Sequence, residues 1–245
     1  MAIYRLSLKS GAVGKGKNHA KYICAKDKYS AKSDMEKVEE FNIPNFAKNG
    51  IEFFEAADNH ERSNGRTYRE FEISLARELS HEQNKNAIMN FVFENKLENQ
   101  PMIIAYHKGK NGDNPHAHLM FSERPNLEVD QDLFFKRNGS KKDRTFNSKE
   151  WLKDCRISWE KHLNKELAQL NKRIKKRVSH KSLKARGIDR KPQPKIGYVA
   201  MAIERRLGQS SRVQKIKDFI EKHKPKKLSR LRSRSARNQD LDRGR

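Results

Sequence analysis

The chain has 245 residues, of which 34% are hydrophobic, and it carries a formal net charge of +24. Residues 171–245 hold 26 basic and 6 acidic side chains, a net of +20, whereas residues 1–170 hold 29 and 25, a net of +4. So dense a basic excess is typical of nucleic-acid binding, and the scarcity of large apolar anchors in residues 171–245 ranks an anionic membrane surface lower.

The N-terminal region is predicted to contain one strand, a glycine- and lysine-rich loop and one short helix. Apolar and polar residues alternate through residues 2–9, as they do along a half-buried strand. The loop is GAVGKGK, residues 11–17, and the helix is predicted over residues 18–30, where it carries Tyr22 and Tyr29. We interpret the mixed, acidic stretch that follows as a connection.

The middle of the chain has the clearest patterns. Residues 67–76 alternate as a strand. Ser80 and Gln83 have the spacing of a capping box, and apolar residues at helical intervals follow them. Two short apolar runs, residues 101–107 and 115–122, flank a segment rich in Gly, Asn and Asp, which predicts a hairpin.

The C-terminal part is predicted to be helical and then disordered. Asn147 and Glu150 have the spacing of a second capping box, which opens an amphipathic stripe. A further helix is expected around Val199–Leu207, and from about Lys222 the low-complexity basic sequence is typical of disorder.

Strands linked by hairpins or by single helices predict an α+β fold. We expect a central, mainly antiparallel sheet with helices packed on one face and polar strand faces exposed on the other. The predicted domain spans residues 1–197, and residues 198–245 form a basic helical segment with a disordered tail.

Cysteine usage and hydropathy indicate the compartment. Cys24 and Cys155 are the only cysteines, and they form neither a zinc-like spacing nor a disulfide framework, as suits a reducing cytosol. The chain contains no run of about 18 apolar residues and begins with no signal-peptide pattern. A cytoplasmic protein without membrane insertion is therefore expected.

Three histidines cluster at the predicted hairpin. His116 and His118 lie two residues apart on one strand face, about 7 Å between Cα atoms, and His107 ends the neighbouring strand. Three neutral imidazoles suit Zn, Mn, Ni or Fe and leave positions open for water and substrate. Surface polarity is the competing interpretation. A histidine-triad hydrolase would need a third histidine at Met120.

A metal beside nucleic acid indicates phosphoryl transfer, which also needs a nucleophile. Tyr22 follows the basic loop on a helix that could lie over the polar sheet face. A tyrosine phenol ordinarily has a pKa of about 10, so a nearby cation or base would have to assist its attack. A packed aromatic side chain is the alternative role for Tyr22.

At these residues the chain resembles the relaxase domain of the MobA/MobL family of plasmid mobilisation proteins, which are HUH endonucleases. The resemblance covers roughly residues 1–195. It rests on MAIYRLSLKSG, AKYICAKDKY, EAADNHERSNGRTYREFEISLARELS, IIAYHKGKNGDNPHAHLMFSER, FFKRNG with the following EWL, and KSLKARGIDRKP.

The resemblance implies a strand-specific DNA nickase with a central antiparallel sheet. His107, His116 and His118 match the metal-binding histidines. Tyr22 matches the nucleophile, which becomes linked to the 5′ end of the cut strand. Tyr29 ranks behind it.

Glu70 and Glu72 fall in the family's acidic strand element. Either could orient a histidine or help to deprotonate the nucleophile, and Glu72 is favoured. The alternative is that these carboxylates form salt bridges with Arg66 or Arg69.

The implied ligands are single-stranded and hairpin DNA of a transfer origin and a divalent metal ion, Mn²⁺ or Mg²⁺. Accessory mobilisation proteins and a type IV secretion coupling protein are the implied partners in a bacterial cytoplasm. The run at residues 172–177 would add affinity that depends on salt. Predicted DNA contacts are Lys15, Lys17, Arg66, Arg69, Lys136 and Arg137, with Lys141 and Lys142 as further candidates.

Two alternatives remain. A rolling-circle replication initiator shares the histidine pair and the tyrosine but usually places the tyrosine after the histidines. A non-catalytic nucleic-acid-binding protein would use the histidines for a structural metal or for none.

Overall fold

The computed structural model describes residues 3–31, 34–109, 112, 114–170, 177–189, 194, 197–208 and 211–222. The predicted disordered tail and nearly all of the basic run at 172–177 lie outside the described residues. The chain divides into two units, Met1–His180 and Lys181–Arg245. The predicted boundary after residue 197 stays a prediction. None of the helices described has both the length and the apolar character that crossing a bilayer requires.

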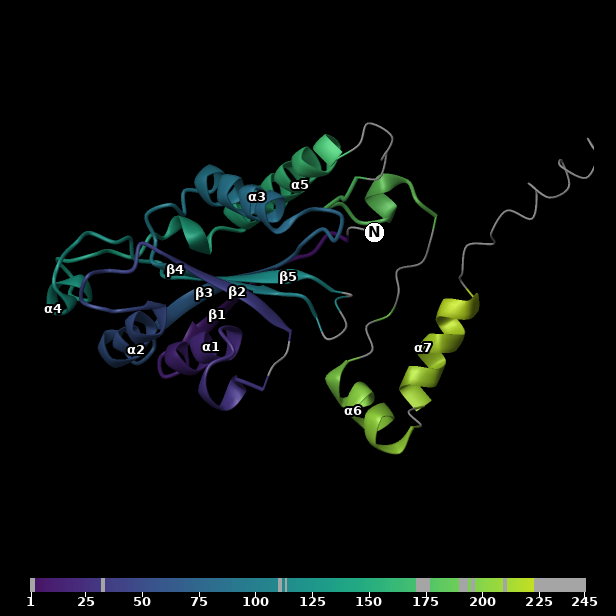
Figure 1. Ribbon diagram of the computed structural model, residues 1–245, viewed down its shortest axis with the longest axis horizontal. Coiled ribbons are helices and arrows are strands. Elements are labelled where there is room, and N and C mark those ends of the chain that lie inside the picture. Colours follow the sequence, from purple (N-terminus) through teal and green to yellow (C-terminus); the bar gives the residue numbers. More distant parts are fainter. Residues whose placement is uncertain are drawn as a thin grey trace, which may run out of the picture. The chain divides into compact units, whose positions relative to one another are not determined.

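The first unit is built on five strands that pair in the order β1-β3-β5-β4-β2, with every pair antiparallel (Figure 1). The strands are β1 (Leu6–Ala12), β2 (Met35–Phe41), β3 (Arg66–Ser74), β4 (Met102–His107) and β5 (His116–Phe121). The helices are α1 (Gly16–Ile23), α2 (Gly50–His60), α3 (His81–Glu94), α4 (Gln131–Phe134) and α5 (Lys149–Leu170). Short 3-10 turns lie at Asp27–Tyr29 and Thr145–Asn147. The predicted α+β class and antiparallel sheet are confirmed.

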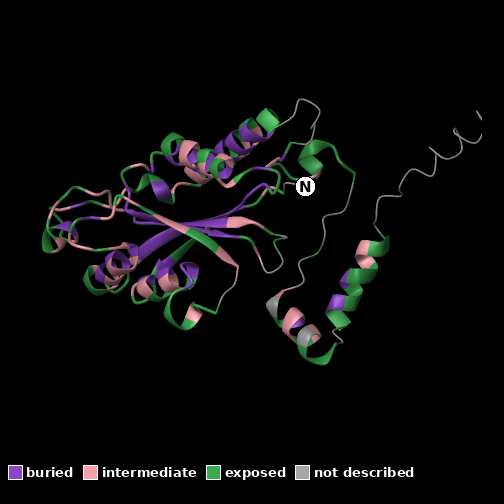
Figure 2. Ribbon diagram, in the orientation of Figure 1, coloured by how far each residue is buried: buried purple, intermediate pink, exposed green. Residues whose placement is uncertain are grey.

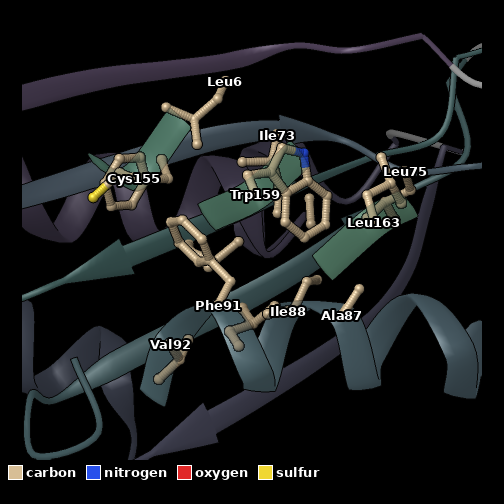
Figure 3. Packing of buried hydrophobic residues seen from close by; sticks show 14 of the residues in the cluster. Leu6, Ile73, Leu75, Ala87, Ile88, Phe91, Val92, Cys155, Trp159 and Leu163 are labelled. Atoms are coloured by element: carbon tan, nitrogen blue, oxygen red, sulfur yellow. The ribbon is translucent and has the colours of Figure 1, made fainter. Parts of the chain in front are cut away.

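Helices α3 and α5 cover one face of the sheet (Figure 1). Phe91 of α3 and Trp159 of α5 are fully buried against Phe71 of β3, and Figure 3 shows Phe91 and Trp159 among their neighbours. Burial of an aromatic side chain of this size contributes roughly 1.5–3 kcal/mol. This packing buries one face of the central strands.

Helices α1 and α2 lie on the second face (Figure 1), so the expectation that helices pack on one face only is wrong. Ile23 of α1 and Phe53 of α2 are fully buried with Met120 of β5 and Ile103 of β4. Figure 2 shows the central strands buried between the two helical layers. The polar side chains of this face are thus enclosed beneath α1 instead of lying open to solvent.

The predicted capping boxes have different outcomes. Ser80 accepts a hydrogen bond from the backbone N–H of Gln83, whose side chain in turn bonds Ser80, so the first box is confirmed. At α5, Ser148 Oγ accepts from the Trp151 N–H instead. The Asn147 side chain is engaged by two arginines, which removes it from the helix end.

The second unit contains a 3-10 turn at Lys184–Arg186, helix α6 (Tyr198–Leu207) and helix α7 (Ser211–Lys222). Helix α6 confirms the helix predicted around Val199–Leu207, whereas α7 was not predicted. Val213 and Ile216, three residues apart on α7, are buried.

Candidate functional site

The register of the hairpin brings the three histidines together. His107, the last residue of β4, pairs directly with His116, the first residue of β5. His118 follows on the same face of β5. The ring centroids of the three imidazoles are 5.1–5.2 Å apart in every pairing. The predicted convergence of these side chains is present in the structure.

Two of the imidazoles are oriented through Nδ1. His116 Nδ1 donates to the carbonyl oxygen of Asn114, 2.8 Å away. His118 Nδ1 is hydrogen-bonded to the carboxylate of Glu70. Metal-binding histidines ordinarily use one ring nitrogen in this way, which fixes the ring and directs the other nitrogen to the metal. In the described part of the chain, no hydrogen bond engages Nε2 of His116 or His118.

His107 makes a different contact. Its Nε2 donates to the carbonyl oxygen of Ile23 in α1, 2.9 Å away, and its Nδ1 lies 3.6 Å from an oxygen of Asp34. Burial is the main cause that lowers the pKa of His107 and of His116 below the ordinary value for histidine. Neutral imidazoles are the form that binds a metal.

The three imidazoles are chemically suitable ligands for a divalent metal, but they are not arranged to coordinate one as they stand. Among the described residues, no three His, Cys, Asp or Glu side chains have the geometry to hold an ion as they stand. His116 and His118 offer Nε2. His107 would have to bind through Nδ1 or exchange its bond to the Ile23 carbonyl for a metal.

Glu70 is a buried carboxylate that is hydrogen-bonded to the histidine cluster. It is fully buried, and its oxygens bond His118 Nδ1 on one side and His19 Nε2, at 2.7 Å, on the other. Burial alone would raise the pKa of Glu70, but the hydrogen bonds from His118 and His19 outweigh it and hold the pKa at about 2. Glu70 is therefore an ionised acceptor at neutral pH.

Glu72, which the sequence favours for this position, has other partners. Its carboxylate forms ion pairs with Arg5 at 2.7 Å and with Lys9 at 2.5 Å. Although Glu72 pairs with His118 in the strand register, the two cations on and beside β1 draw its carboxylate away. The preference for Glu72 over Glu70 as the contact of a histidine is thus corrected, and the expected ion pairs form with Arg5 and Lys9 instead of Arg66 or Arg69.

Tyr22 lies on α1 beside the cluster. The next residue, Ile23, is the one whose carbonyl accepts from His107. The Tyr22 side chain is 41% exposed, so solvent and substrate can approach it. Its ring stacks on His19 at 6.0 Å between centroids and meets Tyr29 edge-on at 5.3 Å.

His19 was not singled out from the sequence. It precedes Tyr22 by three residues, one helical turn, so both side chains share a face of α1. The three-residue spacing from Tyr22 is the signal in the sequence that could have indicated His19. The helical period alone could not show that the strand below carries Glu70, which His19 bonds.

The start of α1 is held by a residue of α2. Asp58 accepts hydrogen bonds from the backbone N–H groups of Gly14, Gly16 and Lys17, each at 2.9 Å. No side chain of the loop itself caps α1. A carboxylate at the positive end of a helix stabilises it by about 0.3–1 kcal/mol. Asp58 therefore fixes where the Tyr22 helix begins.

The predicted DNA contacts in this loop differ from one another. Lys17 forms an ion pair with Glu55 of α2 and thus has a structural partner. Lys15 is exposed at the N-terminal end of α1, without an ion pair to any described carboxylate.

The predicted DNA contacts at the other end of the sheet also differ from one another in burial and in partners. Arg69 is buried and pairs with Glu123 at 2.7 Å, which makes it a structural residue here. Arg66 pairs with the same carboxylate at 2.8 Å but is only half-buried. Lys136 and Arg137 are exposed and line a cavity at this end. None of these four contacts the histidine cluster.

Comparisons with known proteins identify similar chains. A model of the MobA/MobL family matches residues 15–206. The 43 kDa relaxation protein of Salmonella typhimurium is 38% identical over 211 residues, which are 78% of this chain and 56% of that protein. Mobilization protein A of Escherichia coli is 34% identical over 223 residues, 84% of this chain and 31% of that protein. The chain thus spans about half the length of the first relative and about a third of the length of the second.

A solved structure also shares the fold. It is described as "Molecular Basis of Vancomycin Resistance Transfer in Staphylococcus aureus". The TM-score is 0.55 with 25% sequence identity, and the match covers 74% of this chain and all of the other.

Proposed function

The chain belongs to the MobA/MobL family, and from this premise we propose that it nicks and rejoins one strand of plasmid DNA at a transfer origin. The observation that carries the proposal is the site itself. Three imidazoles lie 5.1–5.2 Å apart, and the residue after Tyr22 is hydrogen-bonded to one of them. A metal donor set and an exposed phenol on adjoining elements are what a tyrosine-dependent nickase requires.

His107, His116 and His118 would hold the divalent metal, Mn²⁺ or Mg²⁺. When bound, such an ion polarises a non-bridging oxygen of the scissile phosphate and stabilises the charge that develops there. Glu70 keeps the His118 ring oriented by accepting from its Nδ1, which leaves Nε2 for the metal.

In the reaction, Tyr22 Oη attacks the scissile phosphorus and the bond from phosphorus to the 3′ oxygen breaks. The phenol loses its proton and the leaving 3′ oxygen gains one, so that a 5′-phosphotyrosyl strand and a free 3′-OH result. His19, stacked on Tyr22 and bonded to Glu70, holds the phenol ring in place. Attack by a 3′-OH on the phosphotyrosine reverses the step and rejoins the strand.

The direct test is a nicking assay on a supercoiled plasmid that carries the chain's own transfer origin. We expect conversion to the open circle with Mn²⁺ or Mg²⁺, no conversion with EDTA, and protein attached to the 5′ end after denaturation. A plasmid of equal size without the origin is the control. Binding without cleavage under every metal condition would favour the non-catalytic alternative. Accessory mobilisation proteins and a secretion coupling protein are proposed partners.

Glu70→Gln should weaken the affinity for Mn²⁺ by about 10- to 100-fold, because His118 loses its ionised acceptor while the side-chain volume is kept. Isothermal titration with Mn²⁺ measures the effect. Glu72→Gln is the matched control, since Glu72 bonds Arg5 and Lys9 and should leave the affinity nearly unchanged. Equal losses in both variants would contradict the assignment of Glu70.

A further inference from the structure

A cavity of about 740 Å³ lies at the opposite end of the central strands from the histidines. Arg66 lines it where β3 begins, and Glu123 lines it shortly after β5 ends. The histidine cluster lies at the other ends of these strands, where Ser74 pairs with His116. From His118 to Glu123 the chain advances by five residues, so the two places are about 17 Å apart along the extended chain.

The lining of this cavity is strongly basic. It contains eight Lys and Arg side chains against two carboxylates, Glu61 and Glu123. Both carboxylates are already engaged. Glu61 pairs with Arg124 at 2.7 Å and with Lys142 at 3.1 Å. Glu123 pairs with Arg66 and Arg69, as described above.

Five cations are left over. None of the described carboxylates forms an ion pair with these side chains, which are Arg62, Lys136, Arg137, Lys141 and Arg144. Like charges gathered around one hollow repel each other. An anion bound between them would relieve this repulsion.

The walls of the cavity are held in place. At Gly139 an added Cβ would lie 1.7 Å from the carbonyl oxygen of Leu133, so the turn closes tightly on itself. Ser140 Oγ donates to the Pro125 carbonyl at 2.6 Å. The Phe135 ring stacks on the His60 ring, at 5.5 Å between centroids, and the Arg124 guanidinium lies 5.9 Å from its centroid. The segment that carries Lys136, Arg137 and Lys141 is thus held by contacts within the protein.

We propose that this cavity binds phosphates of the DNA strand, away from the position that is cut; the inference rests on the proposed function. Its volume suits one or two nucleotide units, since ligand pockets of about 300–1,000 Å³ hold molecules of that size. Lysine and arginine side chains contact phosphate oxygens without reading bases, so this binding is independent of sequence and dependent on salt. The cavity adds affinity and direction to a strand whose scissile phosphate lies at the histidines.

The test uses the full chain and fluorescence anisotropy with two labelled probes, a 30-nucleotide single strand and a hairpin duplex. Lys136→Ala/Arg137→Ala should raise the Kd for the contacted probe by roughly 10- to 30-fold near 0.1 M salt. The slope of log K against log salt should fall by about 1.4 for a single strand or about 1.8 for a duplex. The probe whose affinity falls shows whether the cavity binds single-stranded or duplex DNA, and either result supports the proposal.

The matched control is Lys153→Ala/Arg156→Ala, which removes the same charges from exposed positions on α5. It should leave the affinity and the salt slope nearly unchanged. If both double variants lost the same affinity for DNA, only net charge would matter, and the proposal that the cavity binds DNA would be overturned. A Lys136→Ala/Arg137→Ala variant that binds DNA with wild-type affinity would overturn it as well. By contrast, a wild-type protein that binds neither probe would overturn the proposed function itself. Thermal unfolding of each variant confirms that the fold is intact.

Discussion

Tyr22→Phe is expected to abolish the covalent protein–DNA product and to lower the rate of nicking by roughly 10⁴-fold or more, as removal of a nucleophile does in other enzymes. The substitution deletes one oxygen and keeps the ring that stacks on His19. DNA affinity should stay near that of the wild type. Denaturing gels of a labelled origin strand measure the covalent product, and anisotropy measures binding.

Tyr29→Phe is the control for this prediction. Tyr29 meets Tyr22 edge-on, so it is the other phenol that could reach the same phosphate. The Tyr29→Phe variant should nick DNA at a rate within a few-fold of that of the wild type. A Tyr29 variant that is inactive, together with an active Tyr22 variant, would move the nucleophile to Tyr29. Full activity in both single variants and in the double variant would point to attack by water.

His107→Ala/His116→Ala should remove measurable Mn²⁺ binding and all detectable nicking. Two of the three nitrogen donors are lost, and a single imidazole holds a divalent ion weakly. The affinity should fall by more than about 100-fold, because the loss of direct ligands exceeds the 10- to 100-fold effect of outer partners. This pair is chosen because His118 remains as a hydrogen-bond donor to buried Glu70.

His180→Ala is the control for the histidine pair. His180 is an imidazole that bonds Glu160, outside the cluster, and its loss should leave Mn²⁺ binding unchanged. Isothermal titration and the nicking assay are run on all variants at equal folded fraction. Nicking that persists at wild-type rate in His107→Ala/His116→Ala would contradict a role for these side chains in catalysis.

Periodicity predicted the elements whose two sides carry different kinds of residue. Strands β3 and β5 alternate because one side packs into the core around Phe71 while the other carries the polar residues of the site, and helix α3 repeats because one of its sides packs on that core. Strand β2 was missed because it is an edge strand with the sequence MEKVEEF, in which charged residues hide the alternation. Helix α2 was missed with it, within what we interpreted as an acidic connection.

The candidate site could be predicted only where its residues are near in sequence. The three histidines belong to one hairpin, so strand parity was sufficient to bring them together. The partner of His118 depends on which of two carboxylates is drawn to β1. That outcome is set by Arg5 and Lys9, more than 60 residues away along the chain. Long-range pairings of this kind leave no local pattern.

The order of strands in the sheet has a consequence for assembly. Eight residues (108–115) join β4 to β5, whereas 53 residues (13–65) separate β1 from β3. Closing the longer loop costs roughly 2 kcal/mol more. The hairpin that carries the histidines therefore closes at the lower entropic cost, whereas the contact of His19 on α1 with Glu70 forms only when β3 is in place. On a ribosome Tyr22 is made before β3 and before the histidines of β4 and β5, so a chain still in synthesis should be unable to attack DNA until β5 has been made.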